Sequence, residues 1–344
     1  MNIPQNDENI SICFATDNNY VQHLGVAISS LLVNTRTSKG IDIYILNDGT
    51  LTKKNQSRLI SLKTLNKNAN LYFLKIEKNI FENFFLAPKS HITIATYYRF
   101  VIPSMLDKLS KLIYLDCDLV AEGDIEELWN IDLDGNYIAA APDILGRENK
   151  IRLELNTKYY CNAGVLLMNL EKMRKDNIQN EFIKCTLVNE DILKWQDQDV
   201  INIVLENKIK FLDMKWNFQY YYNGSKMDFP KQDIKEADED KKIIHYIGAV
   251  KPWNYYSNRP NGGEYFKYLK LTPWKNFSIK YMVLSFIKSL FCIQSEGRYK
   301  VISILGFRIR MKRKYYILQS QVSSLKEMYL LDIKGKEAPA LVEK

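Results

Sequence analysis

The sequence predicts an α/β protein with a mainly parallel sheet flanked by helices, followed by a small basic appendage. Short apolar runs typical of strands alternate with segments of helical apolar spacing. The run Leu112–Leu115 stops abruptly at acidic residues, which is typical of a strand buried on both faces. Residues 276–344 contain 13 Lys and Arg against 5 Asp and Glu, so they carry the whole net charge of +8, whereas residues 1–275 are neutral.

The first part of the chain alternates strands with helices, which favours parallel pairing. The polar turn at 16–20 stands at a strand–helix junction, where open α/β sheets bind nucleotides, although Asp17 or Asn18 there is commonly just a helix N-cap. No GxGxxG motif is present, which disfavours a dinucleotide-binding loop. Strands are predicted over 10–15, 41–46 and 71–76, with helical spacing over 26–33 and 55–65.

The rest of the chain continues this alternation and then changes character. A helix over 91–100 is expected to carry Arg99 beside a mostly apolar face. In the tail, 279–293 predicts a helix lying in a membrane interface and 301–318 a basic hairpin, with an ordinary packed appendage as the alternative. Strands are predicted over 112–115, 137–141 and 208–214, helices over 124–129 and 201–205, and a polar loop over 228–242.

Two carboxylates follow the buried run one residue apart, at Asp116 and Asp118. Carboxylates at the end of a buried strand are costly unless a cation or hydrogen-bond donors satisfy them, and a polar turn is the alternative. Further along, His245 follows two isoleucines and precedes Gly248 and Lys251. This segment indicates a metal ligand followed by a phosphate-facing loop, although a lone histidine is more often structural.

Two other polar segments precede apolar runs. Asn162 to Gly164 supplies an amide and small residues, typical either of a ligand approaching the main chain or of a β-bulge. The segment Gln196 to Asp199 places four polar side chains before a helical run, more than the first turn of a helix requires.

Composition and termini indicate a reducing compartment. The five cysteines are odd in number and form no CxxC pair, which favours buried free thiols. The N-terminal segment lacks the basic and apolar regions of a secretory signal, and no run reaches the roughly 20 apolar residues that span a bilayer. We therefore expect a cytoplasmic protein.

Taken together, these stretches resemble glycosyltransferase family 8, and most of all the bacterial lipopolysaccharide hexosyltransferases. The resemblance covers about residues 10–274, and its motifs occur in the order of the family. They are FATDNNY at 14–20, YR at 98–99, YLDCD at 114–118, YCNAGV at 160–165, QDQD at 196–199, HYIG at 245–248 and KPW at 251–253.

The resemblance implies a GT-A fold, a mixed and mainly parallel nucleotide-sugar-binding sheet, over 1–275, with 276–344 as a membrane-surface attachment on the inner face of a bacterial cytoplasmic membrane. It implies UDP-galactose or UDP-glucose as donor and an oligosaccharide or glycolipid acceptor, in lipopolysaccharide or other surface glycan synthesis. Nucleic acid is not an expected partner. Asp116, Asp118 and His245 would hold Mn²⁺, which the imidazole favours over Mg²⁺.

The resemblance also assigns residues to the substrates. Cys117 is included in the donor site with its side chain pointing away from the metal. Residues implied for the donor are Ala15, Asp17, Asn19 and Tyr20 at uracil and ribose, Arg99, Asp116, Asn162 and Ala163 toward the sugar, and Gly248 and Lys251 at the phosphates. Residues implied for the acceptor side are His91, Asp143, Gln196 and Ile247.

Family membership further implies retention of configuration at the anomeric carbon. In a double displacement Asp197 would attack that carbon, whereas in front-face return the departing diphosphate deprotonates the acceptor and Gln198 shields the oxocarbenium-like centre. We favour front-face return, because an amide is a poor nucleophile.

Parts of the sequence also fit other classes of function. The segment DCDLV also fits the nucleophile motif of haloacid-dehalogenase-like phosphatases, but there the motif belongs to the first strand. The basic, aromatic tail could bind nucleic acid, yet it contains no recognisable nucleic-acid module. Within the family, the 22 tyrosines leave open a glycogenin-like initiator that glucosylates itself. A non-catalytic transferase is disfavoured because all expected metal ligands are present.

Overall fold

The computed structural model describes residues 3–84, 93–219, 229–248, 251–254 and 262–277, and the backbone of three strands at 291–296, 299–304 and 307–312. The chain divides into two compact units, Met1–Ser278 and Ile279–Lys344. The division lies close to the change in composition after residue 275.

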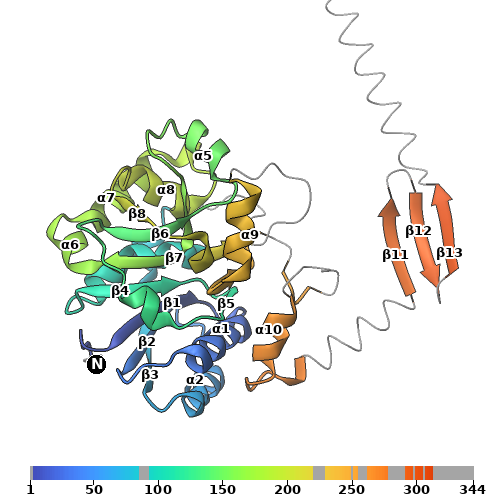
Figure 1. Cartoon of the computed structure of the whole chain (residues 1–344), viewed down its shortest axis with the longest axis horizontal. Coiled ribbons are helices and arrows are strands. Elements are labelled where there is room, and N and C mark those ends of the chain that lie inside the picture. The colour runs from blue at the N-terminus through green and yellow to red at the C-terminus, as the bar shows by residue number, and fades with distance from the viewer. Residues whose placement is uncertain are drawn as a thin grey trace, which may run out of the picture. The chain divides into compact units, whose positions relative to one another are not determined.

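The first unit is built on a seven-stranded sheet. Its strands are β1 (Ile10–Thr16), β2 (Ile41–Asn47), β3 (Ala69–Lys75), β4 (Lys111–Leu115), β6 (Ile138–Pro142), β7 (Cys161–Asn169) and β8 (Ile209–Phe211). They follow the order β3-β2-β1-β4-β7-β6-β8, in which β7 alone runs antiparallel to its neighbours (Figure 1). The predicted mixed, mainly parallel sheet is confirmed.

Helices cover both faces of this sheet. One face packs against α1 (Val21–Asn34), α2 (Lys53–Ile60), η1 (Ser61–Leu65) and α4 (Ile125–Trp129). The other packs against η3 (Ile94–Val101), α3 (Ile102–Met105), α6 (Leu170–Lys175), α7 (Ile178–Val188) and α8 (Gln196–Val204). The remaining short helices are η2 (Lys78–Phe81), α5 (Gly146–Arg152), η4 (Glu190–Ile192) and η5 (Met214–Asn217).

The central strand β4 is buried on both faces, as its sequence predicts. Ile113 and Leu115 belong to one core, whereas Leu112 and Tyr114 belong to the other, and none is more than 1% exposed. Each such side chain contributes about 1.5–3 kcal/mol to stability. The four cysteines whose side chains are described are likewise buried and free.

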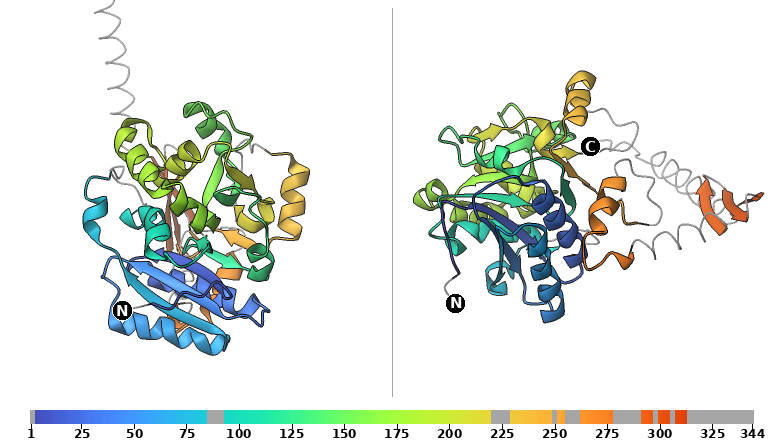
Figure 2. Two further views of the ribbon diagram at one scale, coloured as in Figure 1. Left: turned by 90° about the vertical axis from the view of Figure 1, so that its left-hand side faces the viewer. Right: turned by 60° about the horizontal axis from the view of Figure 1, so that its bottom comes forward.

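A second, smaller sheet completes the first unit. It consists of β5 (Leu119–Ala121), β10 (Ile243–His245) and β9 (Phe218–Gln219). Val120 and Ile244 pack with Val26 of α1 against α10 (Gly262–Leu269), which lies beside α1 in Figure 2. Segments far apart in the sequence thereby meet at the end of β4.

Two sequence predictions about local structure are wrong. The segment 228–242 contains a helix, α9 (Lys231–Glu239), because its residues are good helix formers with i,i+4 partners such as Lys235 and Glu239, 3.6 Å apart. The second is the interfacial helix predicted over 279–293. Residues 291–293 instead belong to a strand, β11 (Phe291–Glu296), and residues 279–290 lie outside the described part.

The second unit contains a three-stranded antiparallel sheet, β11-β12-β13, with β12 at Tyr299–Ile304 and β13 at Phe307–Lys312. The basic hairpin predicted over 301–318 is confirmed as far as Lys312, because Ile304 pairs with Phe307 and Tyr299 with Lys312; residues 313–318 lie outside the described part. In the part of the chain that the structure describes, no helix is both long and apolar enough to cross a membrane.

Candidate active site

Two acidic side chains and one histidine converge at the end of β4. Asp116 and Asp118 follow this strand, and β5 then pairs antiparallel with β10, so that His245 lies opposite Leu119. His245 Nε2 is 3.3 Å from Asp118 Oδ1 and 3.7 Å from Asp116 Oδ2. All three offer ligand atoms within 4.8 Å of one another. The pairing of β5 with β10 thus brings the predicted metal-ligand residues together.

Gly164 of β7 lies directly beneath this cluster. Its carbonyl accepts a 2.8 Å hydrogen bond from the Asp116 backbone N–H. A Cβ atom here would lie 2.2 Å from His245 Cε1 and 2.9 Å from Asp116 Oδ2, so no side chain fits. The small residue predicted to admit a ligand therefore admits the two clustered side chains. The β-bulge named as the alternative is also present here: Ala140 pairs with Leu166 and Pro142 with Cys161, so residues 162–165 of β7 stand opposite Ala141 alone.

Arg99 links this cluster to the start of α8. The predicted helix that carries it is a 3₁₀ helix, η3, and the residue is only 4% exposed. Arg99 Nη2 lies 2.8 Å from Asp116 Oδ1, and Nε lies 3.0 Å from Asp197 Oδ2. Its guanidinium also stands 4.3 Å from the centre of the Tyr114 ring. Burial alone would lower the pKa of Arg99, but Asp116 and Asp197 raise it, so the guanidinium remains charged between them.

Asp197, the second carboxylate beside Arg99, has a strongly perturbed pKa. Burial raises its pKa to about 6, although Arg99 and the hydroxyl donor Thr96 act in the opposite direction. Both interactions occupy the carboxylate, which is buried. Asp197 is therefore placed as a partner of Arg99.

Replacing Asp197 by Asn should flatten the pH dependence of stability between about pH 4 and pH 6. Because the pKa is higher in the folded protein than in an unfolded chain, the folded state binds more protons in this window, and unfolding free energy falls as pH rises. The loss across the window is on the order of 2–3 kcal/mol. Urea unfolding of both proteins at several pH values measures it, and parallel profiles would contradict the assignment.

Gln198, Asn162 and Asp143 form one hydrogen-bonded group beside Arg99. Asp143 Oδ2 accepts from Asn162 Nδ2 at 2.9 Å and from Gln198 Nε2 at 3.1 Å. Gln198 Oε1 accepts from the Ala163 backbone N–H at 3.0 Å, and the Ala163 carbonyl accepts from Arg99 Nη1. Asp143, which the resemblance implies for the acceptor side, thus joins residues implied for the donor sugar.

The other two residues of QDQD have different surroundings. Asp199 is fully buried and accepts hydrogen bonds from Arg152, from Tyr160 Oη at 2.6 Å and from the backbone N–H of Trp195 at 2.9 Å, so it holds the turn that starts α8. Gln196 is 1% exposed and has a positive φ of 41°. Asp199 thus fixes the backbone that presents Asp197 and Gln198, whereas Gln196 Oε1 is buried and meets no hydrogen-bond partner among the described residues.

Lys251 reaches the metal-ligand cluster from the KPW segment. Its ammonium contacts Asp118 Oδ2 and the Tyr246 carbonyl oxygen. Burial alone would raise the pKa of Asp118, but Lys251 and His245 lower it below its ordinary value. Gly248, exposed and with φ of 75°, makes the turn between β10 and Lys251.

The KPW segment is held by aromatic packing. His23 of α1 stacks on Trp253 with ring centres 3.7 Å apart, and its Nδ1 is 2.7 Å from Tyr265 Oη. Burial lowers the pKa of His23 to about 3, so its ring is neutral. Tyr20 meets the edge of Trp253, with ring centres 5.9 Å apart.

The first loop lies against the same edge of the sheet. Asp17 Oδ1 accepts from the backbone N–H groups of Asn19 at 2.8 Å and Tyr20 at 3.1 Å, which closes the turn before α1. The N-cap alternative for Asp17 or Asn18 is wrong, because the N-cap of α1 is Tyr20 and no side chain caps the helix. Cys117 Sγ lies 3.1 Å from the Ala15 carbonyl oxygen and packs in the core, so its side chain faces away from His245.

Two further residues are implied for the acceptor side. His91 lies outside the described residues, whereas Ile247 is half-buried in the loop after β10, and its backbone N–H donates to the His245 carbonyl at 3.0 Å.

Sequence reasoning missed Asn217 and Thr96. Asn217 ends η5, is 1% exposed, and places its Oδ1 3.0 Å from His245 Nδ1. Thr96 donates its hydroxyl to Asp197. Neither residue belongs to one of the motifs, so the sequence did not mark either of them as part of the site.

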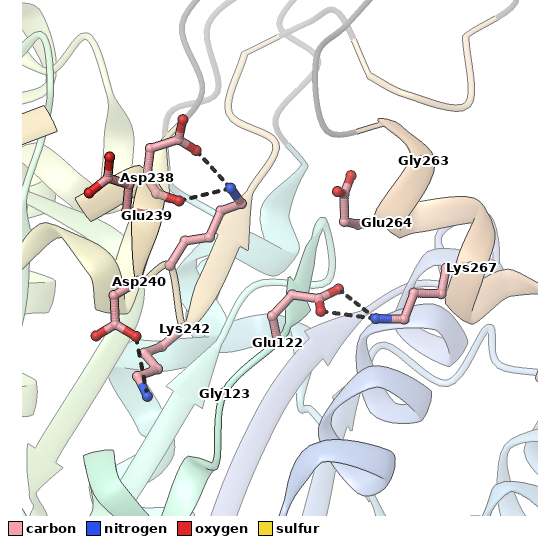
Figure 3. A pocket seen from close by; sticks show the side chains of 10 residues that line it. Glu122, Gly123, Asp238, Glu239, Asp240, Lys242, Gly263, Glu264 and Lys267 are labelled. Carbon is pink, nitrogen blue, oxygen red and sulfur yellow. Dashed lines mark hydrogen bonds and ion pairs between the residues drawn. The ribbon is translucent and has the colours of Figure 1, made fainter. Parts of the chain in front are cut away.

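A cavity of about 390 Å³ lies at the opposite end of β5 and β10 (Figure 3). Its acidic residues are largely paired with lysines: Glu122 with Lys267 at 3.0 Å, and Asp238 with Lys241 at 2.8 Å. The ion pairs account for these charges, so the cavity adds nothing to the site at β4.

Residues 11–257 match the pattern that defines glycosyl transferase family 8. General stress protein A of Bacillus subtilis is 33% identical over 282 residues, which cover 78% of this chain and 96% of that protein. The lipopolysaccharide 1,2-glucosyltransferase of Escherichia coli K12 is 28% identical over 288 residues, covering 79% and 80% of the two chains. The galactosyltransferase LgtC, solved with donor and acceptor sugar analogues, superposes with a TM-score of 0.66 at 25% identity, over 77% of this chain and 96% of that one.

The matched region spans the first loop, the acidic pair after β4, the segment of β7 beneath it, and His245 with Lys251. Both the sequence pattern and the arrangement of the sheet agree with this assignment. The chain therefore belongs to glycosyl transferase family 8 and is a hexosyltransferase.

Proposed function

We propose that this chain is a retaining, Mn²⁺-dependent transferase that moves galactose or glucose from a UDP-sugar to a saccharide acceptor in surface glycan synthesis. The carrying observation is the convergence of Asp116, Asp118 and His245 beside the Arg99–Asp197 pair. Relatives named as lipopolysaccharide 1,2-glucosyltransferase and 1,3-galactosyltransferase support the reaction class and the glycan.

The donor atoms at this cluster fit a divalent cation. Two carboxylates and one imidazole nitrogen are hard to borderline ligands, a set that suits Mn²⁺ better than Mg²⁺. The Asp118 carboxylate stays ionised at neutral pH, since Lys251 and His245 lower its pKa. When bound, the metal would act as a Lewis acid on the leaving diphosphate.

The surrounding side chains would orient the donor. Lys251 stands beside Asp118, where its ammonium can meet a phosphate as a point charge. Arg99 is fixed by Asp116 and Asp197, so its guanidinium loses little freedom when the donor binds. The first loop, through Ala15, Asp17 and Asn19, would hold uracil and ribose.

Front-face return is the mechanism that the geometry favours. The Asp197 carboxylate is buried and occupied by Arg99 and Thr96, which leaves it poorly placed to attack a sugar carbon. Gln198 is half-buried, and its amide is fixed by Ala163 and Asp143. It would shield the cationic centre while the departing diphosphate takes the acceptor proton.

A panel of UDP-sugars with Mn²⁺, scored for release of UDP by slow donor hydrolysis, tests this proposal without an acceptor. We expect turnover with UDP-galactose or UDP-glucose and none when EDTA removes the metal. Analysis of the anomeric configuration of the released sugar by NMR at early times tests retention. Hydrolysis of no UDP-hexose, or inversion, would contradict the proposal.

The second unit is proposed to bind an anionic membrane surface. Its register puts Phe291, Ile293, Ile302, Ile304, Phe307 and Ile309 at positions of one face of the sheet. Arg308, Arg310 and Lys312 alternate with them along β13 and occupy positions of the other face. Lys300 also lies on the first face and Val301 on the second, so the first face is mostly apolar and the second carries three basic residues. Such a sheet suits the boundary between lipid headgroups and acyl chains, as a glycolipid acceptor would require.

Changing Arg308, Arg310 and Lys312 together to Ser should weaken binding of the full chain to anionic vesicles. At about 1 kcal/mol per basic residue, partition should fall roughly 100-fold at low salt. Vesicle sedimentation with phosphatidylserine and with phosphatidylcholine alone measures it. The matched control changes the exposed Lys53, Lys54 and Lys67 to Ser. Equal partition of the two triple variants would contradict the role of the sheet.

A further inference from the structure

Asn217 connects the metal-ligand histidine to the sugar-side amides. Its Oδ1 lies 3.0 Å from His245 Nδ1, and its Nδ2 lies 2.8 Å from Asn162 Oδ1. Asn217 and His245 are 1% and 4% exposed, so water does not compete freely for these bonds. The direction of the hydrogen bond between Asn217 and His245 decides which ring nitrogen of His245 carries the proton.

The direction follows from backbone donors that cannot reverse. The Gly164 N–H donates to the Asn162 side chain at 3.0 Å, so the atom that it meets must be the oxygen. The other end of Asn162 is then the amino group, which agrees with its 2.9 Å bond to the acceptor Asp143. Because Asn217 also faces the oxygen of Asn162, it must present its own amino group there.

The orientation of Asn217 then fixes His245. With its amino group on Asn162, Asn217 turns its carbonyl oxygen to His245 Nδ1, which must therefore carry a proton. In the neutral ring, Nε2 is left with a lone pair, and Nε2 is the atom that faces Asp116 and Asp118 at 3.7 Å and 3.3 Å. A lone pair and two carboxylates then point at one position, as cation binding requires.

We propose that Asn217 is a positioning residue that holds His245 in the Nδ1–H tautomer and so presents Nε2 to the divalent cation; this rests on the proposed metal site. The Gly164 backbone N–H is the fixed point of the chain of bonds, and Asn162 and Asn217 transmit its direction. The same strand fixes Gln198, whose oxygen accepts from the Ala163 N–H. The metal side and the sugar side of the site therefore take their geometry from two successive amides of β7.

Histidine NMR tests this assignment in protein without metal. The chain has only three histidines, so ¹⁵N-histidine labelling with a His245→Gln spectrum for assignment identifies the ring signals of His245. At a pH at which the ¹⁵N shifts show the His245 ring to be neutral, the wild-type protein should carry the ring proton on Nδ1. A neutral wild-type ring that carries its proton on Nε2 would overturn the proposal without recourse to any variant.

Manganese binding tests it a second way. Asn217→Leu keeps the size of the side chain but cannot accept a hydrogen bond from His245 Nδ1. In this variant, Mn²⁺ should bind about 10–100-fold more weakly, as measured by titration with electron paramagnetic resonance detection. The His245 ring should also populate both tautomers. Asn47→Leu, which removes another buried amide, at the end of β2, is the control for loss of stability and should bind Mn²⁺ as the wild type does. A folded Asn217→Leu protein with wild-type affinity and tautomer would overturn the proposal. A wild-type protein that binds no Mn²⁺ would instead contradict the proposed function. The tautomer of His245 would still be tested in that case, because the NMR experiment contains no metal.

Discussion

Asp118→Asn should abolish sugar transfer while leaving the protein folded. The substitution keeps the shape of the side chain but removes the charge that faces His245 and Lys251. A metal that supplies several kcal/mol of charge stabilisation to the leaving diphosphate corresponds to a loss of about 10³-fold or more in kcat. Mn²⁺ affinity and the rate of UDP release are the two measurements, and both should fall together.

The control for Asp118→Asn is Asp42→Asn. Asp42 is also buried, 1% exposed, and accepts hydrogen bonds from Asn9 and Asn70, but it lies at the start of β2, away from the cluster. That variant should lose stability without losing metal affinity. Near-normal turnover by Asp118→Asn, or equal loss of metal affinity in the two variants, would contradict the metal assignment.

Gly164→Ala should disable the site through a single methyl group. Within a strand this substitution normally stabilises a protein by about 0.5–1 kcal/mol, because Gly loses more chain entropy on folding. Here the new Cβ would lie 2.2 Å from His245 Cε1 and 2.7 Å from Nδ1, so the rigid ring must move. A displacement on the order of 1 Å costs about 10²-fold in rate, and Mn²⁺ binding should weaken with it.

Gly263→Ala is the matched control for Gly164→Ala, because a Cβ at Gly263 in α10 would meet nothing within 4 Å. It should keep wild-type turnover and metal affinity. The measurements are the Mn²⁺ titration and donor hydrolysis, together with the melting temperature. A Gly164→Ala protein that is as active as Gly263→Ala would show that His245 tolerates displacement, and the site would then not depend on the close approach of β7.

Several features were predictable because they depend on local chemistry. The alternation of apolar runs with helical spacing gave the sheet, and the acids after Leu115 marked the end of its central strand. The polar turn at 16–20 is also local, since the Asp17 side chain bonds to backbone only two or three residues away. The motifs and their order along the chain predicted the family without any knowledge of contacts between them.

Other features were wrong or missed because they depend on distant partners. The segment 228–242 looked like a loop by polarity, but α9 forms there from good helix formers, with Ala237 buried. Arg99 on a helix would ordinarily be solvated, and only the arrangement of β4 and α8 places carboxylates on both sides of it. The membership of family 8 excludes the phosphatase alternative, which rested on the DCDLV motif alone.

The sequence by itself determined the strand, the acid pair at its end and the residue types that bind a divalent cation. The tertiary structure alone decided that His245 reaches that pair through β5 and β10, that Gly164 must be glycine, and that Asn217 faces His245. The physical reason is that apolar runs and acidic residues can be recognised in the sequence itself. The direction of a side-chain hydrogen bond, in contrast, depends on which backbone donors the folded sheet places beside that side chain.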